Sequence, residues 1–124
     1  MDNDRFKFRV WDIGEKRYIP DVVLSDYGDA YYLQNGELMM RADSSEVIIE
    51  QCTGLKDKNG KLIYEGDVLL DASQKAFVFW NGPIASFCEK LFDWKRKYNC
   101  FDLREIRSNR YEIIGNIHES GENK

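Results

Sequence analysis

Short apolar runs separated by turn residues are the feature that most constrains the fold of this chain. Three Asn-Gly pairs, Asn35-Gly36, Asn59-Gly60 and Asn81-Gly82, punctuate the sequence, and each is flanked by strand-like residues. This dipeptide favours the positive φ angles that both central residues of a type I′ hairpin turn require. The three pairs therefore predict three tight β-hairpins.

The runs between the turns have strand character. Residues 6–11 alternate apolar and charged side chains, the period that places one strand face on a core and the other in water. Further short strands are expected at residues 17–19, 22–24, 30–33, 38–40, 47–49, 62–64, 68–70, 76–80, 84–88, 101–103 and 111–117. Such a series is typical of a meander that closes into a barrel or a sandwich.

Only one stretch has helical periodicity. Between Glu89 and Tyr98, the apolar residues Leu91, Trp94 and Tyr98 recur at positions i, i+3 and i+7. This spacing predicts one short helix within a mainly β domain. Residues 119–124 have nothing to bury, so we expect a mobile tail there.

Composition limits the class of protein. The 124 residues suit one domain, and 43% hydrophobic residues with two prolines favour a folded core. The N-terminus has no apolar signal segment, and the longest apolar run, residues 76–80, is far shorter than the roughly 20 residues that span a bilayer. We therefore expect neither export by a signal peptide nor a membrane protein.

The cysteines and the single histidine predict no metal site. Cys52, Cys88 and Cys100 are odd in number and widely spaced, which favours a reducing, cytoplasmic compartment over a disulfide framework. The chain has no C-x-x-C pair, and His118 lies just before the polar tail. No metal or other cofactor is predicted.

Three segments together resemble one family: residues 8–12 (FRVWD), 51–68 (QCTGLKDKNGKLIYEGDV) and 112–119 (EIIGNIHE). The sequence is similar to the YopX family of phage and prophage proteins. The resemblance implies an all-β core related to SH3-like barrels, an origin in a phage or prophage, and no established activity. On this basis the chain is a single domain over 1–124, with a β extension at about 1–50, a barrel-like core at about 51–118 and the tail at 119–124.

No motif in the sequence assembles a catalytic site, so we predict a protein that is not an enzyme. The loop around Asn59-Gly60 lacks the carboxylates of a calcium loop, and the sole histidine provides no base for a nucleophile. Glu65-Gly66-Asp67 has ordinary turn composition: we expect Asp67 to bond backbone N–H groups and Gly66 to supply a special backbone angle. Asp57 is expected to be nearly neutral for stability.

Charge is distributed unevenly along the chain. The formal net charge is −4, but residues 90–110 hold seven basic and three acidic side chains, which makes this window +4 and the remainder −8. Solvated mixed charge is the usual meaning of such a window, and an interaction face is the alternative. The candidate binding face consists of Lys90, Trp94, Lys95, Arg96, Lys97, Arg104, Arg107 and Arg110.

Two functions follow from these features. The leading hypothesis is an interaction module that binds a protein partner or itself through edge strands or exposed aromatic residues. The alternative is a small nucleic-acid-binding barrel that uses the basic segment 90–110. Trp11, Trp80 and Trp94 are able to stack on bases, but their default role is core packing.

Overall fold

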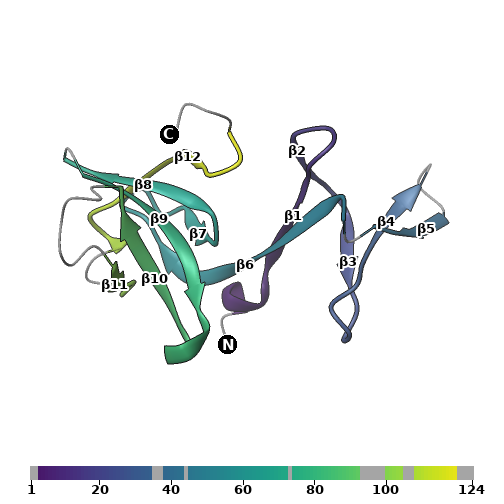
Figure 1. Cartoon of the computed structure of the whole chain (residues 1–124), viewed down its shortest axis with the longest axis horizontal. Coiled ribbons are helices and arrows are strands. Elements are labelled where there is room, and N and C mark those ends of the chain that lie inside the picture. The colour runs from purple at the N-terminus through teal and green to yellow at the C-terminus, as the bar shows by residue number, and fades with distance from the viewer. Residues whose placement is uncertain are drawn as a thin grey trace. The chain divides into compact units, whose positions relative to one another are not determined.

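The computed structural model describes residues 3–34, 38–43, 45–72, 74–92, 100–104 and 108–119, and most of them lie in β-strands (Figure 1). Two single-turn 3₁₀ segments, η1 (Asp4–Phe6) and η2 (Gly82–Ile84), are the helical elements with both ends inside these ranges. The strands are β1 (Phe8–Asp12), β2 (Arg17–Ile19), β3 (Val22–Leu24), β4 (Ala30–Gln34), β5 (Leu38–Arg41), β6 (Val47–Lys56), β7 (Leu62–Tyr64), β8 (Asp67–Asp71), β9 (Gln74–Asn81), β10 (Ser86–Leu91), β11 (Cys100–Asp102) and β12 (Glu112–Asn116). The prediction of a mainly β fold is confirmed. The predicted tail lies outside the described residues except for Glu119.

Two compact units make up the chain. The first comprises Phe8–Glu50, and the second comprises Met1–Lys7 together with Gln51–Lys124. The first carries nine acidic and four basic side chains, a formal net charge of −5, and the second carries 13 acidic and 14 basic ones, a net charge of +1. We refer to them as the acidic unit and the sheet unit. Strand β6 contributes residues 47–50 to the acidic unit and residues 51–56 to the sheet unit.

A curved antiparallel sheet in the order β11-β10-β9-β8-β12 dominates the sheet unit (Figure 1). Alternation along β9 separates its two faces, because Ala76 and Val78 are buried whereas Phe77 and Phe79 are partly exposed. The buried face contributes to the core cluster of Ile63, Leu69, Ala76, Val78, Leu91, Leu103 and Tyr111. Full burial of an aliphatic side chain of this size stabilises a fold by roughly 1.5–3 kcal/mol, so this cluster is the main hydrophobic contribution to the unit.

Asp57 links the turn after β6 to the start of β12. Asp57 is 3% exposed, its Oδ1 accepts the N–H groups of Asn59 and Lys61, both at 2.9 Å, and its Oδ2 accepts that of Ile113 at 3.0 Å. Burial alone would raise the pKa of Asp57, but the three hydrogen bonds outweigh it, so the pKa lies below its ordinary value. These contacts argue against the expectation that Asp57 is nearly neutral for stability. Local sequence could not reveal a donor that lies 56 residues away.

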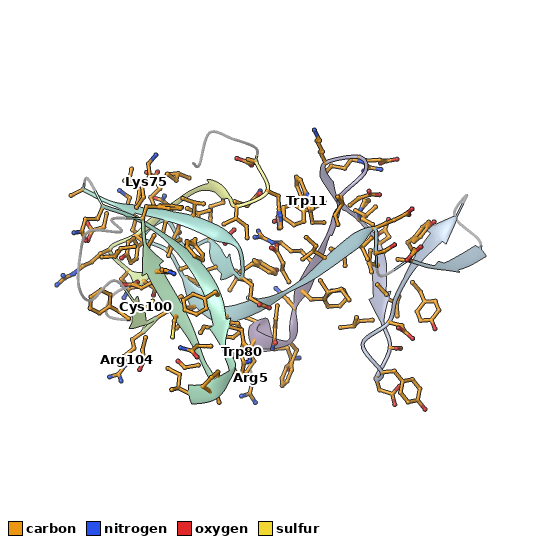
Figure 2. The ribbon with its side chains drawn as sticks, viewed as in Figure 1. Arg5, Trp11, Lys75, Trp80, Cys100 and Arg104 are labelled. Atoms are coloured by element: carbon orange, nitrogen blue, oxygen red, sulfur yellow. The ribbon has the colours of Figure 1, made fainter. Side chains whose placement is uncertain are left out.

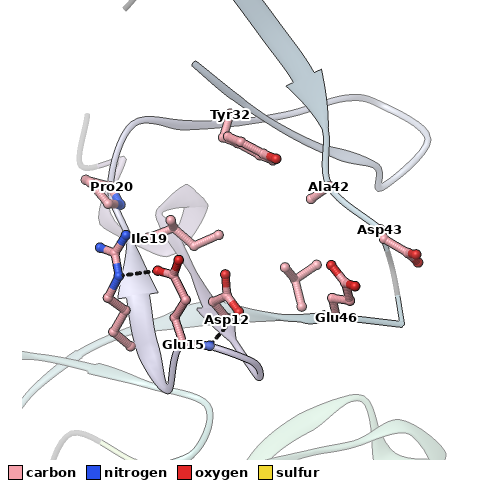
Figure 3. Close-up of a pocket in the computed structure, with 10 residues that line it drawn as sticks. Asp12, Glu15, Ile19, Pro20, Tyr32, Ala42, Asp43 and Glu46 are labelled. Carbon is pink, nitrogen blue, oxygen red and sulfur yellow. Dashed lines mark hydrogen bonds and ion pairs between the residues drawn. The ribbon is translucent and has the colours of Figure 1, made fainter. Parts of the chain in front are cut away.

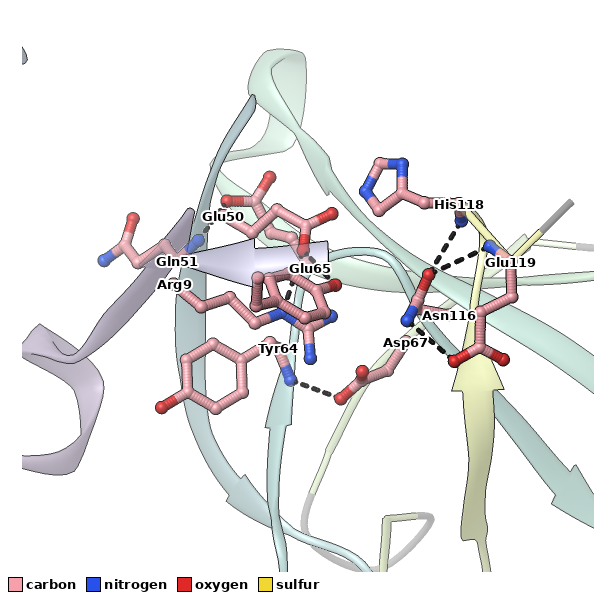
Figure 4. A network of polar contacts seen from close by, with 10 residues as sticks. Arg9, Glu50, Gln51, Tyr64, Glu65, Asp67, Asn116, His118 and Glu119 are labelled. Atoms are coloured by element: carbon pink, nitrogen blue, oxygen red, sulfur yellow. Dashed lines mark hydrogen bonds and ion pairs between the residues drawn. The ribbon is translucent and has the colours of Figure 1, made fainter. Parts of the chain in front are cut away.

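The turn between β7 and β8 has the structural role that the sequence predicts. Asp67 Oδ2 accepts the N–H of Tyr64 at 2.8 Å (Figure 4). Gly66 has a φ angle of 84°, which side chains oppose. Its N–H donates to the carbonyl of Val78, and its own carbonyl accepts the N–H of Ile117, both at 2.8 Å. Both expectations, for Asp67 and for Gly66, are confirmed.

Neither described Asn-Gly pair forms the predicted type I′ turn, although both lie in hairpins. Between β6 and β7, Gly60 has a φ angle of 82° and its N–H donates to the carbonyl of Asp57 at 3.0 Å, the pattern of a type I turn followed by a left-handed glycine. The Asp57 carboxylate stabilises this longer loop. Between β9 and β10, Gly82 begins η2, and Ala85 takes the left-handed conformation. Asn35-Gly36 lies outside the described residues.

The helix predicted between Glu89 and Tyr98 is wrong over its described part. Residues 89–91 belong to β10, and residues 93–99 lie outside the described residues. The three strand residues pair with three consecutive residues of β9. Pairing with a neighbouring strand overrides local periodicity, because the sheet satisfies the backbone hydrogen bonds that a helix would otherwise provide.

The acidic unit has a much smaller core. Strand β1 pairs with β2, and β3, β4 and β5 form a three-stranded antiparallel sheet. Val10, Ala30 and Ala42 form its buried core cluster, and six partly buried apolar side chains pack around them. The unit therefore depends more heavily on polar contacts than the sheet unit does.

One such contact is a partly buried ion pair between Arg9 and Glu50 (Figure 4). Glu50 is 3% exposed, and its Oε1 accepts hydrogen bonds from Arg9 Nε and from the Tyr18 hydroxyl, both at 2.8 Å. The guanidinium of Arg9 also lies 4.4 Å from the centroid of the Tyr18 ring. These contacts join β1, β2 and the first part of β6 within the acidic unit.

Candidate binding groove in the acidic unit

Two tight turns position the carboxylates that line a groove in the acidic unit (Figure 3). In the turn between β1 and β2, Asp12 Oδ1 accepts the N–H of Glu15 at 3.0 Å. In the turn before β6, Asp43 Oδ1 accepts the N–H and the hydroxyl of Ser45 at 2.9 and 2.8 Å, and the Asp43 carbonyl accepts the N–H of Glu46 at 2.9 Å. A backbone bond of 2.9 Å from the N–H of Ile13 to the carbonyl of Glu46 joins the two turns.

The groove has a volume of about 580 Å³. It is lined by Asp12, Glu15, Arg17, Ile19, Pro20, Tyr32, Ala42, Asp43, Glu46 and Val47. Four carboxylates against one guanidinium give this lining a formal charge of −3. The guanidinium is already engaged, because Arg17 Nε lies 2.7 Å from Glu15 Oε2 in an exposed ion pair. The lining therefore presents an excess of negative charge to a ligand.

The rest of the lining is apolar and belongs to the small core. Ala42 is buried in that core, and Ile19, Tyr32 and Val47 pack against it. Figure 3 shows Tyr32 across the groove from the carboxylates of Asp12 and Glu15. An apolar wall facing a row of carboxylates suits a long cationic side chain, whose aliphatic stem packs on the wall while its charge meets the carboxylates.

Metal chemistry finds no support in the described residues. Among them, no group of three or more His, Cys, Asp or Glu side chains is arranged to hold a metal ion. Burial raises the pKa of the Cys52 thiol, and burial together with a hydrogen bond to Asp102 raises that of Cys88. Neither of these two buried thiols is thus activated as a nucleophile or ligand.

The structure places three members of the predicted binding face. Lys90 is exposed on β10, Arg110 is exposed just before β12, and Arg104 is exposed after β11, with its Nη2 3.4 Å from Asp102 Oδ2. The other five members, Trp94, Lys95, Arg96, Lys97 and Arg107, lie outside the described residues. The described members thus come from three different parts of the sheet unit.

Two tryptophans differ from each other in their packing. Trp11 is buried and forms an edge contact with Tyr18, as the default core role predicts. Trp80 is 48% exposed, so the core-packing expectation is wrong for this residue. Its ring makes an edge-to-face contact with the ring of Phe87, and the two centroids are 4.9 Å apart. The pair lies at the end of a hairpin, where solvent limits burial.

The groove was not predicted from the sequence. Its acidic residues fall into two pairs, one near residues 12–15 and one near 43–46, and only the fold brings the two turns together. The sequence signal that points to it is the net charge of −5 over residues 8–50.

Within the described part of the chain, no helix is both long and apolar enough to cross a membrane.

Comparison with known proteins places the chain in a family. No curated protein matches it. Among solved structures, the crystal structure of protein EF1440 from Enterococcus faecalis is similar, with 25% sequence identity, a TM-score of 0.58, and coverage of 94% of this chain and 95% of that chain. The chain matches the YopX protein family over residues 7–123, nearly its full length, which confirms the resemblance carried by the three segments. The chain therefore belongs to the YopX family.

Proposed function

We propose that this protein is a non-enzymatic protein-interaction module whose acidic groove binds a basic segment of a protein partner. The observation that carries the proposal is the combination, in one groove of about 580 Å³, of four carboxylates with an apolar wall. The partner segment presents Lys or Arg side chains. A second copy of this chain is one source of such a segment, because residues 90–110 carry seven basic side chains.

The negative net charge of the acidic unit also favours a basic partner segment. A net charge of −5 on residues 8–50 attracts a basic partner over about a Debye length, roughly 8 Å at physiological ionic strength. Such steering raises the association rate, and it weakens as salt is added. The ion pair between Glu15 and Arg17 is exposed and easily rearranged, since pairs of this kind contribute only about 0–1 kcal/mol.

The resemblance to phage and prophage proteins supplies the setting for this function. We place the protein in the cytoplasm of a bacterial host, where the partner is either a host protein or another phage protein. Three reduced cysteines, none of them in a disulfide, are compatible with that compartment.

Affinity capture with matched variants tests the proposal. Asp43→Asn combined with Glu46→Gln removes two groove charges, and Asp21→Asn combined with Asp26→Asn removes two exposed charges elsewhere in the same unit. We expect the native protein and the Asp21/Asp26 variant to retain the same partner from infected cells, and the groove variant to lose it. Cross-linking should map the contact to a basic segment of that partner.

Direct titration with the captured partner then gives the affinity. We expect the groove variant to bind at least tenfold more weakly, because paired charges at interfaces are worth a few kcal/mol when one member is removed. Sedimentation of the protein alone tests the case in which the partner is a second copy. A partner held equally by both variants, or through an acidic segment, would refute the proposal.

A further inference from the structure

The outer face of β9 and β10 carries a row of aromatic rings. Side chains alternate between the faces of a strand, so Lys75, Phe77 and Phe79 lie on the opposite face of β9 from the buried Ala76 and Val78. In the ladder with β10, Phe77 faces Lys90, and Phe79 faces Cys88. Residues that face each other in an antiparallel pair share a face of the sheet.

Three rings make up this row. The ring centroids of Phe77 and Phe79 are 6.0 Å apart, and those of Phe77 and Phe92 are 5.6 Å apart. All three side chains are partly exposed, and none belongs to either core cluster. The row therefore lies on the face of the sheet opposite the core cluster, where its rings are partly exposed beside the buried Val68 and Cys88.

Two exposed lysines lie beside the rings. Lys75 and Lys90 are both exposed, and Lys75 projects outward from the sheet (Figure 2). Asp102 on β11 faces Cys88, which in turn faces Phe79, and its Oδ2 lies 3.4 Å from Arg104 Nη2, so its charge is offset. The described part of β9 and β10 thus presents three partly exposed rings, with the exposed Lys75 at one end of the row and the exposed Lys90 opposite Phe77.

We propose that this aromatic row and its two lysines form a stacking platform for single-stranded nucleic acid. Every base has a π-face, so a row of rings about 6 Å apart stacks successive unpaired bases without regard to sequence. The lysines meet the phosphates that flank those bases. A duplex hides its base faces within its own stack, so it is excluded from the platform.

The platform is distinct from the surfaces considered above. It shares only Lys90 with the candidate binding face that the sequence predicts, and it lies in the sheet unit, whereas the groove lies in the acidic unit. Failure of the groove proposal therefore leaves this one intact, and the reverse also holds.

Fluorescence anisotropy with labelled oligothymidylate and oligouridylate of about 12 nucleotides is the direct test. The platform variant is Phe77→Leu with Phe79→Leu, which keeps apolar volume but removes two π-faces. Trp80→Leu with Phe87→Leu is the matched control, because these residues form an aromatic pair on the other face of the same two strands. Circular dichroism and thermal melting check that each variant is folded.

We expect both oligonucleotides to bind at low salt and the platform variant to bind them at least tenfold more weakly, since each stack is worth a factor of roughly 5 to 150. The control should retain the native affinity. Lys75→Gln with Lys90→Gln should lower the salt slope by about 0.7 for each lost phosphate contact. Absence of binding, equal binding of a matched duplex or of heparin, or an unchanged platform variant would overturn the proposal.

A cross-linking experiment on the native protein keeps the proposal testable if the double variant does not fold. Oligonucleotides that carry 5-iodouracil cross-link to stacked aromatic side chains when irradiated. Mass spectrometry should place the adduct on Phe77, Phe79 or Phe92. An adduct confined to Trp80, or to residues of the acidic unit, would exclude the platform.

Discussion

Asp57 is a single residue whose removal should strongly weaken the sheet unit. Its carboxylate accepts three backbone N–H groups while almost fully buried. Asp57→Ala leaves those donors unsatisfied, so we expect urea unfolding at pH 7 to show a loss of about 2–3 kcal/mol. Lys58→Ala, in the same turn but exposed, should change stability by less than about 0.5 kcal/mol. Equal, small effects would contradict the role assigned to Asp57.

The same carboxylate should make stability depend on pH. Its folded pKa lies below the ordinary value, so its contribution is fully present above the unfolded pKa of about 3.9 and is lost as pH falls through the lower, folded pKa. Unfolding measured between about pH 6 and pH 3 should therefore show a steeper loss for the native protein than for Asp57→Asn. Parallel curves would mean that the carboxylate has the same pKa in both states.

Gly66 is a residue whose backbone angle, rather than its contacts, sets the effect of substitution. At a φ of 84°, a β-branched residue is strained by about 1–3 kcal/mol, so Gly66→Val should lower the urea midpoint clearly. Gly115→Ala is the control, because Gly115 lacks a positive φ and a Cβ there meets only the flexible end of Glu119, at 2.7 Å. We expect Gly115→Ala to cost less than about 1 kcal/mol. Similar losses at both positions would reject the backbone explanation.

Thiol reactivity should distinguish the three cysteines. Cys100 is exposed, whereas Cys52 and Cys88 are buried and have raised pKa values, so little thiolate forms at either buried site. A disulfide-exchange reagent near pH 8 should label one thiol rapidly in the folded protein and the other two only after unfolding. Rapid labelling of a second thiol, identified by mass spectrometry, would show that a buried site opens readily.

At the scale of elements, local signals found the strands but not the exact turns. Alternation and apolar runs predict strands where the structure has β2, β3, β7 and β8, because strand formation there agrees with the residues' own preferences. Turn type depends on further contacts. The Asn59-Gly60 loop is set by the Asp57 carboxylate and its bond to Ile113 on β12, which no local pattern contains.

The helix predicted between Glu89 and Tyr98 was wrong for the same reason, because contacts outside the local sequence decide the structure there. An apolar spacing of three and four residues beyond Glu89 indicates a helix, yet residues 89–91 complete β10 because β9 offers them a ladder. The acidic groove was equally invisible, since its two turns are far apart in the sequence. Sequence therefore predicted the class of fold and the family, and it missed the features that arise when distant segments meet.

At the scale of the whole molecule, the two units have unequal hydrophobic cores. The core cluster of the acidic unit holds three buried side chains, none larger than valine, whereas that of the sheet unit holds seven, five of them larger than valine. Small units bury a lower fraction of their surface and are correspondingly less stable. The excess of negative charge on residues 8–50 adds self-repulsion within the acidic unit.

We therefore expect the acidic unit to open before the sheet unit. In native-state hydrogen exchange, the hydrogen-bonded amides of β4 should exchange at least tenfold faster than those of β9, because both are central strands and the core cluster of the acidic unit is smaller. Urea below the unfolding transition should increase the difference between the exchange rates of β4 and β9. A basic ligand in the groove should decrease that difference, since a ligand stabilises the state that binds it. Equal protection of the two strands under all conditions would mean that the chain unfolds as one cooperative unit, and the difference between the cores would then have no energetic consequence.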